Sequence, residues 1–250
     1  MKDHKCMKIC FLAGTLGQGG AERQLFYQLQ ALINSGAQPV LICFSRGEYW
    51  QAPIEALGIN VIVVEVRSRL FRLMKIISFL RAFRPEIVQA AHFYLNLYSL
   101  FGAWFCGARA IGAVRSSGVQ DIMDVGNISG NASLLSMHYV AANSENAVRY
   151  IEGNYRNHPR LFYFPNVVDT DRFSFTNPDH GKKIKILMVG RFVQEKRFDL
   201  FLNALSKLSQ AGRDNFEGHL VGDGPERIGM EKLAVNLGLA AETVYFHGSV

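Results

Sequence analysis

Two basic residues, Arg191 and Lys196, lie in a short segment that the sequence predicts to join a strand to a helix. The segment directly follows the apolar run Ile184–Val189, so both side chains are expected to project from the carboxyl end of that strand. A planar guanidinium and a compact ammonium, placed a few residues apart, suit the several oxygens of a diphosphate. The segment therefore predicts a diphosphate site, and a solvated loop without a ligand is the alternative.

A glycine-rich segment with Gly14, Gly17, Gly19 and Gly20 follows the first apolar run and precedes a helical pattern. Glycine lets the backbone approach a ligand, and the free N–H groups at a helix N-terminus attract phosphate. We expect a phosphate contact here, and a tight strand-to-helix turn is the alternative. A nicotinamide enzyme is disfavoured, because the glycines do not follow G-x-G-x-x-G spacing and the second strand ends near Arg46 without a ribose-binding acid.

A basic helical pattern over residues 67–84 contains no acidic residue. Arg72 and Lys75 are expected on the side opposite the apolar residues of this helix. Together with Arg69 they are candidates to contact an anionic membrane surface. The alternative, which we favour, is a helix that packs its apolar side on a sheet and leaves its basic residues in solvent. The apolar residues at helical spacing are Leu70, Leu73, Met74, Ile77 and Leu80.

The elements that must position these segments form an α/β pattern. Short apolar runs alternate with patterns of helical length, which is typical of βαβ units and a parallel sheet covered on both faces. We predict one doubly wound, Rossmann-like domain over residues 1–165. Its expected strands are Lys8–Ala13, Pro39–Phe44, Asn60–Val64, Ile87–Ala91, Ala110–Val114, Tyr139–Ala142 and Leu161–Phe164, and its expected helices are Ala21–Asn34, Leu70–Phe83, Leu95–Cys106 and Ser144–Glu152.

A polar, aperiodic stretch at residues 166–183 is predicted to link this domain to a second βα series at residues 184–250. Three strands make about half of a Rossmann-like domain, so we expect the second domain to be incomplete in this chain. The expected strands are Ile184–Val189, Gly218–Val221 and Val244–His247, and the expected helices are Asp199–Ser209 and Pro225–Leu237.

Composition narrows the function classes. With 49% hydrophobic and 19% charged residues, the chain can bury a core and is not disordered. Its net charge of +6 favours acidic ligands. A nucleic-acid binder is disfavoured, because the basic residues are neither interleaved with exposed aromatic residues nor gathered on one recognition helix.

The cysteines and the apolar stretches indicate a cytoplasmic protein. The four cysteines lack the spacing of metal ligands and are expected as reduced thiols, so no metal is predicted. The N-terminus has no signal-peptide cleavage pattern, and the longest apolar stretch is interrupted by Arg109. The inner face of the membrane is the alternative location, through the basic helix above.

Seven motifs, taken in order, resemble glycosyltransferase family 4, the retaining transferases with the GT-B fold. They extend over nearly the whole chain, and their order and spacing carry the resemblance. The motifs are Gly19-Gly20-Ala21-Glu22-Arg23, Arg84-Pro85-Glu86-Ile87-Val88, Ala142-Asn143-Ser144, Pro165-Asn166-Val167-Val168-Asp169, Gly190-Arg191-Phe192 with Lys196, Val221-Gly222-Asp223-Gly224-Pro225, and Phe246-His247-Gly248.

The resemblance implies an acceptor domain followed by a nucleotide-sugar-binding domain. It implies that Arg191 and Lys196 hold the donor pyrophosphate and stabilise the departing nucleoside diphosphate, without a metal or another cofactor. Gly222 and Gly224 would let the backbone approach the nucleotide base. The donor-binding residues that it implies are Gly19, Gly20, Asn166, Gly190, Arg191, Lys196, Gly222 and Gly224.

This sequence departs from the family pattern at two places. Many members carry a histidine after the fifth strand, where this chain has Arg115, so Arg115 is expected to contact sugar or phosphate instead. His92, after the fourth strand, is a weaker candidate and is more simply a structural residue. The family's pair of glutamates for sugar hydroxyls and ribose lies beyond the third strand of the second domain, where this chain has ended.

The predicted function is transfer of a sugar, with retention, from a nucleotide-sugar donor to a glycan or lipid-linked acceptor. Cell-surface polysaccharide or glycolipid synthesis is the expected context. The alternative is a truncated or split module that binds nucleotide or acceptor without catalysis and needs a partner chain.

Overall fold

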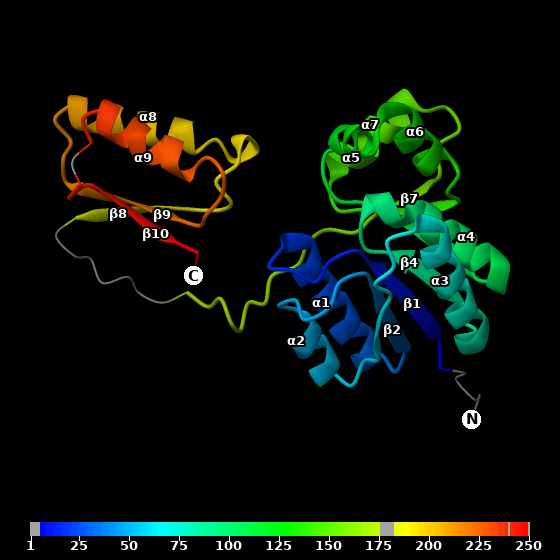
Figure 1. Ribbon diagram of the computed structural model, residues 1–250. Helices are drawn as coiled ribbons and strands as arrows, with labels where there is room; N and C mark the ends of the chain where they lie inside the picture. The colour runs from blue at the N-terminus through cyan, green and yellow to red at the C-terminus, as the bar shows by residue number, and fades with distance from the viewer. Residues whose placement is uncertain (1–5, 176–182, 240, 250) are drawn as a thin grey trace. The chain divides into compact units, whose positions relative to one another are not determined.

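The computed structural model describes residues 6–175, 183–239 and 241–249, which form two compact units, Met1–Thr170 and Asp171–Val250. The two units are described separately below. Both are parallel α/β structures, as predicted (Figure 1). No helix in the described ranges is both long and apolar enough to cross a lipid bilayer.

The first unit contains a seven-stranded parallel sheet with the order β3-β2-β1-β4-β5-β6-β7. Every predicted strand is present, with bounds shifted by at most two residues. A strand run such as Ile9–Ala13 is buried throughout, because helices cover both faces of a parallel sheet. The strands are β1 (Lys8–Ala13), β2 (Gln38–Cys43), β3 (Val61–Val63), β4 (Ile87–Ala90), β5 (Arg109–Val114), β6 (Tyr139–Ala142) and β7 (Arg160–Tyr163).

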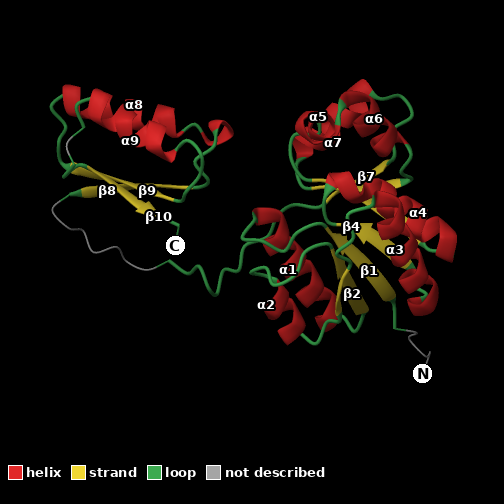
Figure 2. Ribbon diagram, viewed as in Figure 1, coloured by secondary structure: helices red, strands yellow, loops and turns green. Residues whose placement is uncertain are grey.

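Helices lie on both faces of this sheet (Figure 2). On one face, Leu25 and Leu29 of α1 pack with Phe11 of β1. On the other face, Ile76 and Leu80 of α3 pack with the opposite side of the same strand. The helices of this unit are α1 (Gly20–Asn34), α2 (Gln51–Ala56), α3 (Arg69–Phe83), α4 (Asn96–Cys106), α5 (Val119–Val125), α6 (Asn127–Leu135) and α7 (Glu145–Asn154), with a 3₁₀ turn, η1 (Phe93–Leu95).

The strand order reverses between β1 and β4, which pair with each other in the centre of the sheet. The chain leaves these two strands in opposite directions across the sheet, toward β2 and toward β5. In open parallel sheets this point is where ligands bind. The loop after β1 is the glycine-rich segment, and His92 follows β4.

The prediction of which side of α3 is buried and which is exposed is wrong in part. Ile76 and Leu80 are the buried residues of this helix, whereas Leu70 and Met74 are exposed. Arg72 does not point away from the unit: its guanidinium lies 4.4 Å from the centre of the Phe44 ring, and its Nη2 donates to the Val66 carbonyl. The cause is that apolar residues occupy two sides of this helix, and packing against the sheet selects only one of them.

The first residues of the predicted linker, at Val167, are hydrogen-bonded to the first unit. The side chain of Gln24 on α1 accepts a hydrogen bond from the Val167 N–H at 2.8 Å and donates one to the Val167 carbonyl at 2.9 Å. These paired bonds fix the chain just after β7, close to Asn166.

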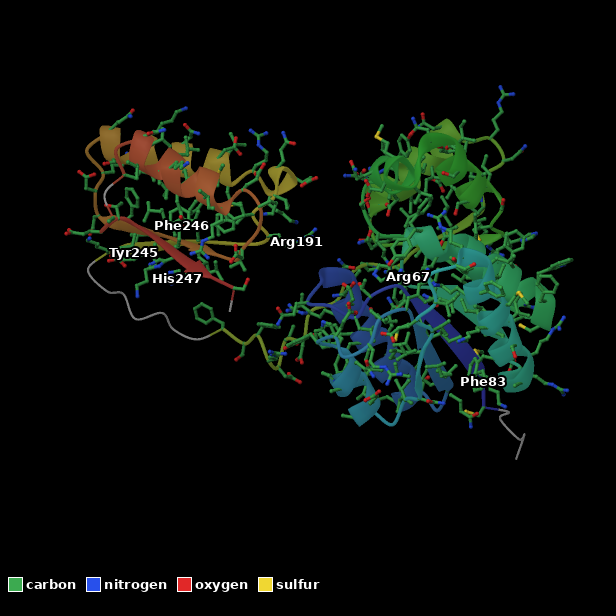
Figure 3. The ribbon with its side chains drawn as sticks, viewed as in Figure 1. Arg67, Phe83, Arg191, Tyr245, Phe246 and His247 are labelled. Carbon is green, nitrogen blue, oxygen red and sulfur yellow. The ribbon has the colours of Figure 1, made fainter. Side chains whose placement is uncertain are left out.

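The second unit contains a three-stranded parallel sheet with the order β10-β9-β8. Both helices cover the same face, where Phe198, Leu202 and Leu205 form the core with Phe216 and Leu220. Phe246 lies on this helical side of β10, and Tyr245 and His247 on the other (Figure 3). The elements are β8 (Ile184–Val189), a 3₁₀ turn η2 (Gln194–Lys196), α8 (Phe198–Gln210), β9 (Phe216–Val221), α9 (Arg227–Asn236) and β10 (Val244–Gly248).

Candidate active site

The loop between β8 and α8 is held by Phe192, the residue next to Arg191. Phe192 is almost fully buried, and its ring stacks on that of Phe198 with the ring centres 4.0 Å apart. Its N–H donates to the Asp223 carbonyl, and its own carbonyl accepts from the Glu226 N–H. The loop is therefore anchored at its middle, which leaves the residues on both sides of Phe192 in defined positions.

Arg191 and Lys196 are exposed on this anchored loop, and Arg191 is labelled in Figure 3. The neighbouring Arg197 is different, because it forms a two-pronged ion pair with Asp199 at 2.9 Å. Within the described ranges, neither Arg191 nor Lys196 forms an ion pair with a carboxylate. Two cations on a fixed loop are thus available to an anionic ligand, as a diphosphate site requires.

Gly222 and Gly224 lie against the same loop. A Cβ on Gly222 would be 1.8 Å from the Gly190 carbonyl oxygen, and one on Gly224 would be 2.6 Å from the Phe192 carbonyl oxygen. Their φ angles of 135° and 157° also favour glycine. The loops after β8 and β9 can therefore pack against each other only with glycine at both positions. The approach of Gly222 and Gly224 to a nucleotide base stays a prediction.

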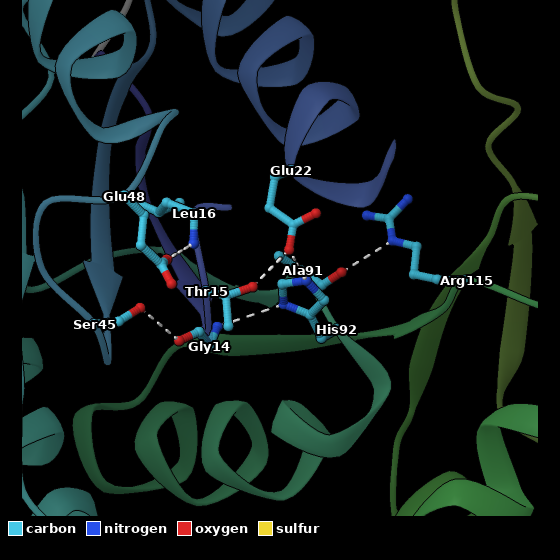
Figure 4. Close-up of polar contacts among 9 residues, drawn as sticks. All are labelled: Gly14, Thr15, Leu16, Glu22, Ser45, Glu48, Ala91, His92 and Arg115. Carbon is cyan, nitrogen blue, oxygen red and sulfur yellow. Dashed lines mark hydrogen bonds and ion pairs between the residues drawn. The ribbon is translucent and has the colours of Figure 1, made fainter. Parts of the chain in front are cut away.

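In the first unit, a polar network joins the loops after β1 and β4 at the carboxyl edge of the sheet (Figure 4). The Glu22 carboxylate accepts a hydrogen bond from the Thr15 hydroxyl at 2.6 Å and lies 3.2 Å from Nε2 of His92. The Gly14 N–H donates to Nδ1 of His92 at 3.4 Å. Since Nδ1 accepts a hydrogen bond, a neutral His92 carries its proton on Nε2. The Nε2–H then donates a hydrogen bond to the Glu22 carboxylate.

The network keeps Glu22 ionised although its side chain is buried. Burial acts to raise the pKa of Glu22, but the hydrogen bonds from His92 and Thr15 outweigh it, and the pKa is lowered from its ordinary value. His92 thus ties the glycine loop to α1, which agrees with the structural role expected for it and also places a carboxylate beside the edge of the sheet.

Arg115 follows β5 at the same edge and is held from two directions. Its Nε donates to the Ala91 carbonyl at 3.1 Å, next to His92. Its main-chain N–H donates to Oδ1 of Asp121. Burial lowers the pKa of Arg115 from its ordinary value, and the charge of Asp121 opposes this shift. An arginine stays protonated in proteins, so a partly desolvated cation lies close to the Glu22–His92 pair.

Asp121 fixes the whole loop after β5. Its Oδ2 accepts from the N–H and hydroxyl of Ser116, at 2.9 and 2.6 Å, and from the Gly118 N–H at 3.4 Å. Asp121 is buried on the first turn of α5. The carboxylate thereby sets the direction in which Arg115 leaves the sheet.

Gly19 and Gly20 lie where α1 begins. Gly19 is the N-cap and offers no side chain to the helix N–H groups. A Cβ on Gly20 would meet nothing within 4 Å, whereas one on Gly19 would be 2.0 Å from the Glu22 carboxylate. The Glu22 carboxylate thus lies against the positive end of the helix at Gly19, while the main chain at Gly20 stays uncovered. Asn166 is exposed after β7.

The predicted site residues form two groups. The first unit brings Gly19, Gly20, His92 and Arg115 to one edge of its sheet, while Arg69, Arg72 and Lys75 lie on α3. The second unit gathers the remaining donor-binding candidates, except Asn166, around the loop after β8. In the described residues no group of three or more metal-ligating side chains occurs.

Two residues that shape the site were not predicted. Glu22 and Asp121 each stand three positions after a glycine that caps a helix, Gly19 and Gly118. An acidic residue at this third position is a known signal for a helix N-terminus. The signal was present in the sequence, but it does not reveal that the two carboxylates would also bind Thr15, His92 and Ser116.

Comparison with protein families gives two matches that together extend over most of the chain. Residues 18–172 match the family described as Glycosyltransferase Family 4, and residues 169–250 match the family described as Glycosyl transferases group 1. No curated protein matches the chain in sequence.

Solved structures with the same fold are distant in sequence. HepE from Anabaena, in complex with UDP and glucose, is 17% identical with a TM-score of 0.77, over 98% of this chain and 70% of that chain. A glycosyltransferase from Rickettsia africae is 17% identical with a TM-score of 0.73, over 99% and 69% of the two chains. The lipopolysaccharide outer core galactosyltransferase WaaB is 17% identical with a TM-score of 0.68, over 98% and 68%. These likenesses confirm the predicted GT-B-like fold.

Proposed function

The chain belongs to glycosyltransferase family 4, and from this membership we propose that it transfers a sugar, with retention, from a nucleotide-sugar donor to a glycan or lipid-linked acceptor. The proposed setting is the cytoplasm or the inner face of the membrane, in cell-surface polysaccharide or glycolipid synthesis. The observation that carries the proposal is the anchored loop after β8, with the exposed cations Arg191 and Lys196, which form no ion pair among the described residues.

The chemistry follows from where charge develops. When the bond between the anomeric carbon and the diphosphate oxygen breaks, negative charge grows on the departing diphosphate. Cations that are already in place stabilise that charge without reorganising during the reaction. Phe192 supplies this preorganisation, because its stacking on Phe198 and its two main-chain hydrogen bonds fix the loop that carries Arg191.

The first unit supplies groups of both signs at the edge of its sheet. We assign Arg115 and the main chain at Gly19 and Gly20 to attracting phosphate or sugar oxygens, with Gly20 uncovered at the start of α1. The Glu22 carboxylate, which His92 holds in place, can accept hydrogen bonds from sugar hydroxyls. We assign these groups to orienting the donor or acceptor sugar, since orientation lowers the barrier to transfer.

The first donor to test is uridine diphosphate sugar, because HepE from Anabaena was solved with UDP and with UDP-glucose. We expect one nucleoside diphosphate of a panel, and its sugar conjugate, to raise the melting temperature of the chain by several degrees. A ligand at 100 times its Kd adds about 2.7 kcal/mol of stability. The measurement is thermal denaturation with uridine, adenosine, guanosine and cytidine diphosphates.

The matched control is the uncharged nucleoside, which lacks the groups that Arg191 and Lys196 are proposed to hold. It should leave the melting temperature unchanged. An equal rise with nucleoside and diphosphate, or no rise with any diphosphate at millimolar concentration, would refute the proposed donor site.

A further inference from the structure

Tyr94 has no role in the polar network described above, although its side chain lies beside that network. It follows His92 and the buried Phe93 at the start of η1, shortly after β4. Its ring stacks on the His92 imidazole, with the ring centres 5.4 Å apart and the planes inclined by 19°. A Cβ on Gly14 would be 1.7 Å from the Tyr94 hydroxyl oxygen, so this hydroxyl lies directly over the glycine-rich loop. The side chain is therefore held at its ring and at its tip.

This fixed tyrosine is nevertheless open to solvent. Glu22, His92 and Arg115, named here the edge site, are mostly buried, and the Glu22 and His92 side chains are 10% and 14% exposed. Tyr94 is 48% exposed. Within the part of the chain that the structure describes, its hydroxyl forms no hydrogen bond. Tyr94 thus offers a ligand both a flat apolar ring and an unused hydroxyl, at the point of the sheet where ligands bind.

The charges that act on Tyr94 are mainly negative. The carboxylates of Glu22 on α1 and of Glu48 after β2 both accept hydrogen bonds from the glycine-rich loop (Figure 4). Burial, and then the charges of Glu22 and Glu48, raise the pKa of Tyr94 from its ordinary value, and the charge of Arg72 opposes this shift. The Tyr94 hydroxyl is therefore protonated near neutral pH and can donate a hydrogen bond.

These features together select one class of ligand. A sugar ring has an apolar face of C–H groups and a rim of hydroxyls, so it can lie on the Tyr94 ring while its hydroxyls donate to a carboxylate. A phosphate or carboxylate group on that sugar would be repelled by the like charges of Glu22 and Glu48. An uncharged sugar ring meets both conditions.

We propose that Tyr94 is a specificity-determining residue of the edge site, where an uncharged ring of the sugar that accepts the transfer lies against Tyr94 and donates hydrogen bonds to Glu22. This inference rests on the proposed function, because it takes the acceptor of the transfer to be a sugar. The probes that test it carry no nucleotide, and Tyr94 belongs to the first unit. Failure of this test therefore leaves the nucleotide experiment on the loop after β8 unaffected.

Saturation-transfer NMR of the full chain with the methyl glycosides of glucose, galactose, mannose and N-acetylglucosamine tests the proposal. At least one glycoside should bind, with the largest saturation on the protons of one face of its ring. Its 6-phosphate and its uronate should bind about tenfold more weakly, because like charges repel. Tyr94→Ala should weaken binding of the neutral glycoside about tenfold, and Tyr94→Phe, which keeps the ring, should weaken it much less.

The matched control is Tyr163→Ala, which removes an equally exposed ring on β7 of the same unit and should bind the glycoside as the parent chain does. Tyr94→Leu keeps an apolar side chain over Gly14 and replaces the alanine variant if that variant is unstable. Glu48→Gln keeps an acceptor for the Leu16 N–H but removes a negative charge. It should narrow the difference in affinity between the neutral glycoside and its 6-phosphate.

Three results would overturn the proposal. The first is that no neutral glycoside binds at tens of millimolar. The second is that Tyr94→Ala and Tyr94→Leu bind the glycoside as tightly as Tyr163→Ala does. The third is that the 6-phosphate binds the parent chain at least as tightly as the neutral glycoside, which would make the edge site an anion site.

Discussion

Replacing Gly222 with alanine is expected to unfold the second unit while the first unit stays folded. The new Cβ would lie 1.8 Å from the Gly190 carbonyl oxygen, and the φ of 135° is itself unfavourable for alanine. Backbone strain of roughly 1–3 kcal/mol and overpacking of roughly 1–3 kcal/mol act together. A unit with one small core has little stability to lose.

Limited proteolysis with mass analysis of the fragments measures this effect. In Gly222→Ala, cleavage should appear throughout residues 184–239, and fragments of the first unit should persist. The matched control is Gly229→Ala on α9, where a Cβ meets nothing within 4 Å and alanine is favoured over glycine in a helix. Equal protection of the Gly222→Ala and Gly229→Ala variants would show that the loops after β8 and β9 do not pack as described.

Replacing Arg191 or Lys196 with alanine is expected to weaken binding of a nucleoside diphosphate by about 1.5–3 kcal/mol, roughly 10- to 150-fold. Each side chain would lose a charge-assisted hydrogen bond to the diphosphate, and in the described structure neither has an ion-pair partner that its removal would disturb. The measurement is isothermal titration calorimetry. Both substitutions are at exposed positions, so the melting temperature without ligand should change little.

The control for this prediction is Arg213→Ala, which removes an exposed charge elsewhere in the second unit. Its Kd should match that of the parent chain, which separates a specific contact from a change in net charge. If both Arg191→Ala and Lys196→Ala bind the diphosphate as tightly as Arg213→Ala does, the two residues do not hold the ligand.

The strands could be predicted from the sequence because buried parallel strands are continuous apolar runs, and β1 and β6 are such runs with the predicted bounds. The strand β8 also has its predicted bounds, although most of its residues are exposed. The short helices α2, α5 and α6 could not be predicted. They are too short for apolar residues to recur several times at helical spacing, and Gly126 separates α5 from α6. Their formation depends on tertiary contacts, such as the packing of Ile122 and Leu134 with Val140.

The candidate site could be predicted only where a residue's type and its place at a strand end were sufficient. Arg191 and Lys196 meet that condition, because a loop after a parallel strand opens at the carboxyl edge. The partners of Glu22 and Asp121 come from distant segments, such as His92, and no local pattern specifies them. The inward direction of Arg72 could not be predicted for the same reason. Its partner Phe44, which directly follows β2, is distant in the sequence.

Hydrogen exchange with and without a saturating nucleoside diphosphate tests whether the loop after β8 is the donor site. Exchange is expected to slow in residues 190–197 and 222–226, where the ligand would cover the main chain beside Arg191 and Gly222. Slowing there should be absent in the Arg191→Ala and Lys196→Ala double variant at the same ligand concentration. Saturable binding that leaves exchange in both of these segments unchanged would show that the diphosphate binds elsewhere on the chain.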